Sequence, residues 1–198
     1  MEEKVQELFT VNQFLLELSI NKKIVNSFVS FFIPIGKNWN NINNDDNHII
    51  LMDQNNKYMV ESSSFLNPGC LVKHLFNGKK ESEGGLRWIS KTSKEASIQV
   101  TFPHPLRVNL ISMTSRNEYW TEGPSDFGIL GLNESGNLTK LRSFHNIYWT
   151  QNENQLFAFD NTKKFSSYKL IFTRSCYGES EYLYGMSELN LGEFNLDK

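Results

Sequence analysis

Long apolar runs are absent from this chain of 198 residues. The most apolar run, VNSFVSFFIPI at 25–35, is shorter than the roughly 20 residues that a membrane-spanning helix requires. The N-terminus MEEKVQELF has no basic flank before a short apolar core, so no secretory signal is expected. These absences predict a non-secreted, cytoplasmic protein without a membrane span.

Cysteine is scarce, and neither sign of charge dominates. Cys70 and Cys176 are the only cysteines, too few for a disulfide framework and compatible with two reduced thiols, although a bond between them stays open. The 20 Lys and Arg residues nearly balance the 22 Asp and Glu residues. A nearly neutral chain has no broad electrostatic attraction to nucleic acid or to an anionic membrane.

Sequence motifs for catalysis are missing as well. No G-x-S-x-G element or phosphate-binding glycine loop is present, and neither cysteine lies in a nucleophile signature. The four histidines are isolated, without the H-x-x-x-H spacing that puts two metal ligands on one helix face; they are His48, His74, His104 and His145. We expect each of them in a loop or at the surface, and we expect the protein not to be an enzyme.

The first 50 residues contain three kinds of segment. Residues 2–20 carry apolar side chains between charged ones, without Gly or Pro, which is typical of an amphipathic helix. Residues 24–35 combine β-branched and aromatic residues, and periodicity does not decide between a helix and a buried strand. Residues 36–48 are rich in Asn and Asp, which favour turns. The sequence therefore predicts an N-terminal helical or extended arm with an Asn-rich loop over residues 1–50.

Short strand candidates follow one another over residues 51–198. HIILMD and KYMVESSS are spaced as a hairpin, and Ile98, Val100 and Phe102 alternate with polar neighbours. Further candidates are RVNLISMTS, DFGILGL, LFAFD, YKLIF and SELNLGEF. About eight short strands with almost no helical periodicity predict an all-β domain, an antiparallel β-sandwich.

Several of these elements resemble, in order, the discoidin or coagulation factor 5/8 type C family of galactose-binding-like domains. They are YMVESSS, LFNGK and LRWIS, then ASIQVTFPHPLRVNLISMTSR, GPSDFGILGLNESGNLTKL, and finally LFAFDN, SSYKLIF and MSELNLGEF. The resemblance covers about two thirds of the chain, from Tyr58 to Phe194. It implies a jelly-roll sandwich whose core contains Trp88, Phe102, Phe127, Phe157, Phe159 and Phe172.

The resemblance also bears on cofactors. Many relatives hold a structural cation with the Asp of a Phe-Asp-Gly element, but this chain has Asn77 there, a neutral and weaker ligand for calcium. Glu81 or Glu83 is a candidate replacement. We expect no cofactor and no tight calcium site near Asn77.

Arg116 matches the Arg that ends a strand in carbohydrate-binding relatives, where a guanidinium donates hydrogen bonds to sugar hydroxyls. The predicted ligand-binding residues are Arg116, Asn117, Tyr119, Trp120 and Tyr177. Tyr148 and Trp149 form a second aromatic pair. The alternative is structural: Arg116 pairs with a loop carboxylate and Trp120 packs under the loop, or the rings fill a protein interface.

Two functions follow from these patterns. The one that we favour from the sequence is a non-catalytic structural or interaction subunit of a large assembly, such as a cytoskeletal or viral one. It would dock on protein partners through its N-terminal arm and end loops, because the apolar residues between 5 and 33 suit a buried contact. The alternative is a lectin-like module that binds a glycan through the Arg116 loop.

Overall fold

The computed structural model describes residues 29–33, 48–53, 56–81, 84, 86–91, 94–176 and 183–194. The predicted helix over 2–20, the Asn-rich loop up to residue 47, and Tyr177 lie outside these residues. All of the strands that the sequence predicts from residue 48 onward form within the described residues.

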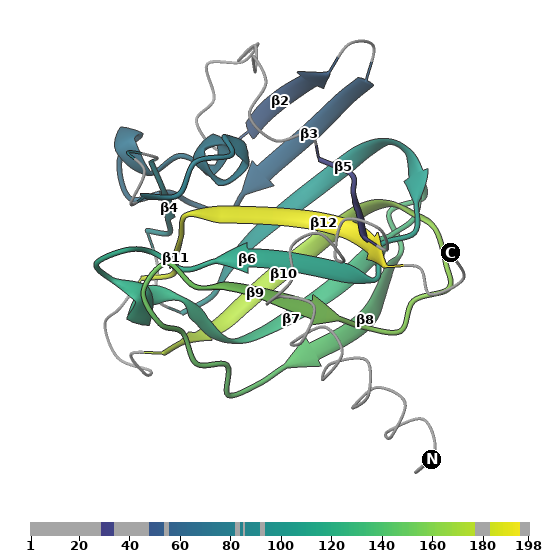
Figure 1. The fold of residues 1–198 in the computed structure, drawn as a ribbon. Coiled ribbons are helices and arrows are strands. Elements are labelled where there is room, and N and C mark those ends of the chain that lie inside the picture. Colours follow the sequence, from purple (N-terminus) through teal and green to yellow (C-terminus); the bar gives the residue numbers. More distant parts are fainter. Residues whose placement is uncertain are drawn as a thin grey trace.

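Two antiparallel sheets lie face to face and form a β-sandwich (Figure 1). The six-stranded sheet has the order β2-β3-β5-β10-β7-β8, and the four-stranded sheet has the order β1-β12-β6-β9. The strands of the first are β2 (His48–Asp53), β3 (Asn56–Ser62), β5 (Ala96–Leu106), β10 (Phe165–Ser175), β7 (Pro124–Leu132) and β8 (Leu138–Phe144). The strands of the second are β1 (Val29–Phe31), β12 (Glu188–Phe194), β6 (Leu110–Thr114) and β9 (Asn154–Ala158).

Shorter elements complete the described fold. Strand β4 (Trp88–Ile89) pairs with β11 (Gly185–Met186) as a third, two-stranded sheet. Three short 3-10 helices are described, namely η1 (Pro68–Cys70), η2 (Val72–Phe76) and η4 (Trp120–Glu122). Both η1 and η2 precede β4, and η4 precedes β7.

The core lies between the two sheets because alternate residues of each long strand point inward. In β5 these are Ile98, Val100 and Phe102, as the sequence pattern predicts, and all three are buried. Phe127 meets Phe157 of the opposite sheet edge to face, with ring centroids 5.1 Å apart. The predicted core residues are all buried; they are Trp88, Phe102, Phe127, Phe157, Phe159 and Phe172.

The described residues contain twelve strands rather than about eight. Three of the additional strands, β1, β4 and β11, have only two or three residues, too few to show a period-two pattern. Strand β8 is exposed along most of its length, so its sequence lacks the apolar alternation of a half-buried strand.

Residues before position 51 also form strands of the two sheets. Strand β1 pairs with β12, with Val29 opposite Phe194, and β2 begins at His48. Beyond β1, the ring of Phe32 lies 6.2 Å from that of Phe102, and Ile33 is buried. The sheets thus begin earlier in the chain than the boundary that the sequence predicts.

Strand register brings several loops to one end of the sandwich. Thr114, the last residue of β6, lies opposite Asn154 of β9 and Glu188 of β12, which are the first residues of their strands. In the other sheet, Ser175 at the end of β10 lies opposite Pro124 at the start of β7. The loops that follow β6 and precede β9 therefore meet at the same end.

Candidate functional site

Three segments, which we call the end loops, lie together at this end of the sandwich. They are the described part of 77–87 before β4, residues 115–123 between β6 and β7, and residues 145–153 between β8 and β9. Loops at one end of a rigid sandwich commonly carry a ligand site.

Arg116 is buried at the centre of the end loops, with 3% of its surface exposed. Its Nη2 lies 3.2 Å from Oε1 of Glu81, and its Nε donates to Oε2 of the same carboxylate at 3.4 Å. On the other side, its Nη1 donates to Glu122. The guanidinium is thus held between carboxylates from two different loops.

Glu81 gathers further donors around the same cluster. Its Oε2 accepts a hydrogen bond from the backbone N–H of Asn117 at 2.9 Å, and its Oε1 lies 3.4 Å from Nη1 of Arg87. Two carboxylates and two guanidinium groups therefore balance in charge. Pairing of this kind is needed to offset the cost of removing charges from water.

Two opposing effects act on the pKa of Glu122. Burial raises the pKa of its carboxyl group, and the neighbouring Arg116 guanidinium opposes that increase. The backbone of Gly185 covers this pair so closely that an added Cβ would lie 2.5 Å from Oε2 of Glu122 and 2.8 Å from Cδ of Arg116. The backbone at the start of β11 therefore packs directly against one side of the ion pair.

Tyr119 lies over the buried cation. The Cζ atom of Arg116 is 4.7 Å from the centroid of the Tyr119 ring, a cation–π contact. The tyrosine nevertheless keeps 52% of its surface exposed. An aromatic ring that is fixed from below and open to solvent is a suitable platform for a ligand.

Asn117 ties the first loop to a second one. Its Oδ1 accepts hydrogen bonds from Nε2 of Gln151 at 2.8 Å and from Nδ2 of Asn152 at 2.5 Å. The backbone N–H of Asn152 donates to the carbonyl of Arg116, and that of Ser115 donates to the carbonyl of Glu153. Residues 115–123 and 145–153 consequently form one connected surface.

The two tryptophans of these loops serve mainly to pack them. Trp149 is buried, and its Nε1 donates to the carbonyl of Pro124 at 3.0 Å. Gly123 allows this ring to approach, because a Cβ at that position would lie 2.5 Å from Cδ1 of Trp149. Trp120 is half-buried and packs against the core.

The predicted ligand-binding residues differ in how exposed they are. Tyr119 is exposed, Asn117 and Trp120 are half-buried, and Tyr177 lies outside the described residues. Arg116 is enclosed by carboxylates, the structural alternative that its sequence also allows. Tyr148, with 71% of its surface exposed, is a further aromatic side chain of the end loops. A ligand-binding role for these residues stays a prediction.

The sequence does not indicate which carboxylates pair with Arg116. Glu81 lies 35 residues before it, and only the fold brings the two together. Glu122 is six residues away, and an acidic residue at that distance in a loop was the available signal. The sequence suggested a loop carboxylate without indicating which one.

Features near Asn77 bear on the question of a cation. The Oδ1 of Asn77 accepts a hydrogen bond from the backbone N–H of Lys79, and the Glu81 carboxylate is engaged by arginines. Glu83 is not among the described residues. Within the part of the chain that is described, no group of three His, Cys, Asp or Glu side chains is placed to hold a metal ion.

One histidine, His74, and both cysteines are buried or half-buried. The expectation of four loop or surface histidines is wrong for His74, which is buried in η2 because the short helix packs against the sandwich. Cys70 and Cys176 are both free thiols, and burial raises the pKa of each.

In the described chain, no helix has the length and apolar character needed to cross a membrane.

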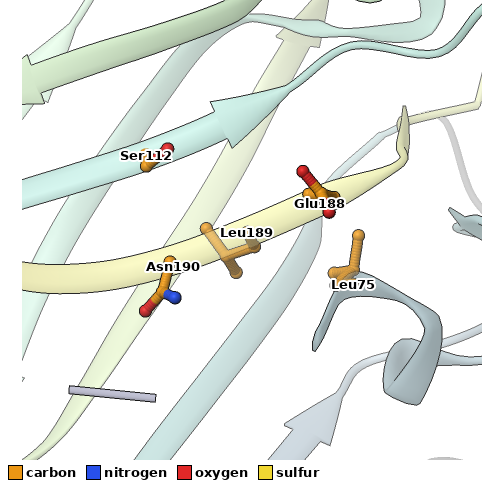
Figure 2. Close-up of a pocket in the computed structure, with 5 residues that line it drawn as sticks. All are labelled: Leu75, Ser112, Glu188, Leu189 and Asn190. Atoms are coloured by element: carbon orange, nitrogen blue, oxygen red, sulfur yellow. The ribbon is translucent and has the colours of Figure 1, made fainter. Parts of the chain in front are cut away.

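A small cavity lies between η2 and β12, and Tyr119 is not among its lining residues. Figure 2 shows its lining, with Leu75 pointing from η2 toward β12; the other lining residues are Ser112, Glu188, Leu189 and Asn190. Its volume is about 30 Å³. Ligand pockets usually measure roughly 300–1,000 Å³, so this cavity suits a water molecule rather than a sugar.

Comparison with known proteins identifies the fold. No protein-family model matches the sequence, and no curated protein matches it. Among solved structures, a family 32 carbohydrate-binding module of Clostridium perfringens in complex with galactose is similar at a TM-score of 0.56 and 17% identity, covering 69% of this chain and 93% of that one. A second Clostridium perfringens module, in complex with GalNAc-β-1,3-galactose, has a TM-score of 0.55 and 16% identity over 68% and 94% of the two chains.

A lectin domain has the same architecture. The lectin domain of lectinolysin, complexed with Lewis B antigen, is similar at a TM-score of 0.52 and 14% identity, over 67% of this chain and 89% of that one. At such low identities the similarity establishes the fold, a galactose-binding-like β-sandwich of the discoidin type, as the sequence predicts.

Proposed function

We propose that this galactose-binding-like β-sandwich is a non-catalytic carbohydrate-binding module whose ligand lies on the Tyr119 ring at the end loops. The observation that carries the proposal is the geometry of that ring. It is fixed over the buried Arg116 at 4.7 Å, yet half of its surface is exposed. The fold shared with carbohydrate-binding modules and a lectin domain supports the same function.

The surroundings of Tyr119 supply the other contacts that a sugar requires. A sugar ring presents an apolar face to an aromatic side chain and hydroxyl groups at its rim, so a few polar side chains must lie beside the platform. Asn117 is two residues away, and its Nδ2 donates to none of the described residues. It is available to donate to a sugar hydroxyl, and Tyr148 on the connected loop is a second exposed aromatic side chain.

The charge of the end loops indicates how the ligand is held. The buried guanidinium of Arg116 is already paired with Glu81 and Glu122. Because this cation is already neutralised by its partners, it offers little attraction to an anionic ligand, and the proposed ligand is a neutral glycan. The affinity of a neutral ligand should change little between low and high salt.

The proposal is tested first with a glycan microarray and then by calorimetric titration of the best glycan. Tyr119→Ala should weaken binding about tenfold, equivalent to about 1.4 kcal/mol, because it removes the aromatic platform. Leu138→Ala is the matched control, since it shortens another exposed apolar side chain at the far end of β8. Glycan binding that is unaffected by Tyr119→Ala, or no bound glycan on the array, would contradict the proposal.

The role in an assembly that the sequence favours rests on the N-terminal arm. That arm lies mostly outside the described residues, and none of the similar structures is named as an assembly component. Docking on protein partners and a cytoplasmic location therefore stay predictions, and the glycan-binding alternative has the better support.

A further inference from the structure

We infer that Arg116 is a positioning residue, which together with Glu81 and Glu122 fixes the Tyr119 ring in the orientation that a ligand requires. The inference rests on the glycan site proposed above. It assigns Arg116 a role different from the direct sugar contact that the sequence suggests. The residue would act through Tyr119 without touching the ligand.

The first step is that the guanidinium cannot move. Glu81 holds it through two nitrogens and Glu122 through a third, and the two carboxylates come from separate loops. The aliphatic stem is confined as well, because a Cβ on Gly185 would lie 2.8 Å from its Cδ atom. Both ends of the side chain are thus fixed by the surrounding fold.

The second step is that the fixed guanidinium determines where the tyrosine lies. The ring centroid of Tyr119 is 4.7 Å from Cζ of Arg116, and the cation attracts the face of the ring. Tyr119 precedes the short helix η4, with φ −122° and ψ 52°, and its cap makes no side-chain hydrogen bond. The contact with Arg116 is therefore the main described constraint on the orientation of the ring.

The third step is that a lysine cannot replace this arginine. A planar guanidinium can donate to carboxylates on two sides while its face lies against a ring, whereas an ammonium group is a compact point charge. Arg116→Lys should preserve the charge but lose the second carboxylate or the ring contact. Glu122→Gln has almost the same shape as the native residue and weakens the ion pair from the opposite side.

Direct contact between Arg116 and a glycan fits the geometry less well. Only 4% of the side-chain surface is exposed, and the two carboxylates occupy three of its nitrogens. A sugar hydroxyl would have to displace a charged acceptor, and a carboxylate accepts more strongly from a guanidinium than a hydroxyl does. The structure thus favours action through Tyr119.

The first measurement requires no glycan. The ring signals of Tyr119 are assigned by NMR with a Tyr119→Phe variant and are then compared in Arg116→Lys, in Glu122→Gln and in the control Arg142→Lys, which changes an exposed arginine of β8. We expect the ring signals to shift in the first two variants and to stay in place in the control. Unchanged ring signals in a folded Arg116→Lys and in Glu122→Gln would overturn the inference.

The second measurement is a double-mutant cycle on glycan affinity. If Arg116 acts through Tyr119, Arg116→Lys should lose about as much affinity as Tyr119→Ala, and the double variant should lose no more than either. Losses that multiply would show that Arg116 contacts the glycan independently, which would overturn the inference. Shifted ring signals in a chain that binds no glycan would instead support the positioning role and reject the proposed function, so the two failures are distinguishable.

Discussion

Gly123 illustrates how a single residue keeps the end loops in place. The side chain of Trp149 fills the space where a Cβ of residue 123 would be, with three indole atoms within 2.8 Å. Trp149 is itself buried and hydrogen-bonded to the carbonyl of Pro124, so it cannot move aside. The indole and the glycine together join the loop after β6 to the loop before β9.

Gly123→Ala should therefore destabilise the fold by about 2 kcal/mol, because overpacking a rigid site commonly costs about 1–3 kcal/mol. Gly128→Ala is the matched control, since its Cβ would lie 3.6 Å from the carbonyl of Arg142, an ordinary contact. Chemical denaturation of both variants measures the difference. Equal stability of the two variants would show that Trp149 can give way.

His74 makes stability depend on pH. Burial in η2, helped by the charges of Lys73 and Arg87, lowers its pKa from 6.5 to about 4. Between these values the unfolded chain binds a proton that the folded chain does not, so stability should fall as the pH falls from 6.5 toward 4. A pKa difference of this size corresponds to a loss on the order of 3 kcal/mol.

Urea denaturation at a series of pH values tests this dependence. His74→Gln should remove the histidine contribution and flatten the stability profile in that range. His104→Gln, which changes an exposed histidine, is the control and should keep the native slope. An identical slope in His74→Gln and in the native chain would assign the acid sensitivity to other groups.

Among the elements, β8 is the exposed edge of the six-stranded sheet, and within the described residues it pairs only with β7. Unpaired edge strands are liable to pair with other chains, and charged side chains on them oppose this pairing. Lys140 and Arg142 are both exposed on β8. In an antiparallel pair of two copies along this edge, the cations of one copy would approach those of the other.

Replacing both cations with valine should therefore allow β8 to associate with another copy. The double variant Lys140→Val with Arg142→Val is expected to show concentration-dependent association in sedimentation velocity, whereas the native chain should not associate through this edge. Lys163→Val with Lys164→Val removes the same charge from exposed positions before β10 and is the control. Association of both double variants to the same degree would attribute the effect to net charge.

Some of the strands can be predicted from the sequence pattern and others cannot. The strands β5 and β10 alternate largely between apolar and polar residues because one face of each is more deeply buried than the other, so their positions are predictable. Strands β4 and β11 have two residues each, and their pairing depends on contacts between distant segments. Short pairings of this kind leave no local signal in the sequence.

At the scale of the whole molecule, the resemblance to discoidin domains led to the correct fold, whereas the ligand site that it implies around Arg116 stays a prediction. The resemblance also led to Tyr119, which is exposed at the end loops, and to Asn117, which is half-buried there. The enclosure of Arg116 was not predictable in detail, because Glu81 reaches it only through the folded arrangement of separate loops. Burial and pairing are properties of the assembled molecule, whereas residue type and order can be read from the chain.

The proposed function depends most on the binding of a glycan at Tyr119. The most direct measurement is NMR chemical-shift mapping of the isotope-labelled full chain with the glycan that binds best. If the glycan lies on Tyr119, the shifted backbone signals should belong to residues 115–123 and 145–153, with the largest changes next to Tyr119. Shifts that instead cluster along β8, or around the cavity lined by Leu75 and Asn190, would contradict it.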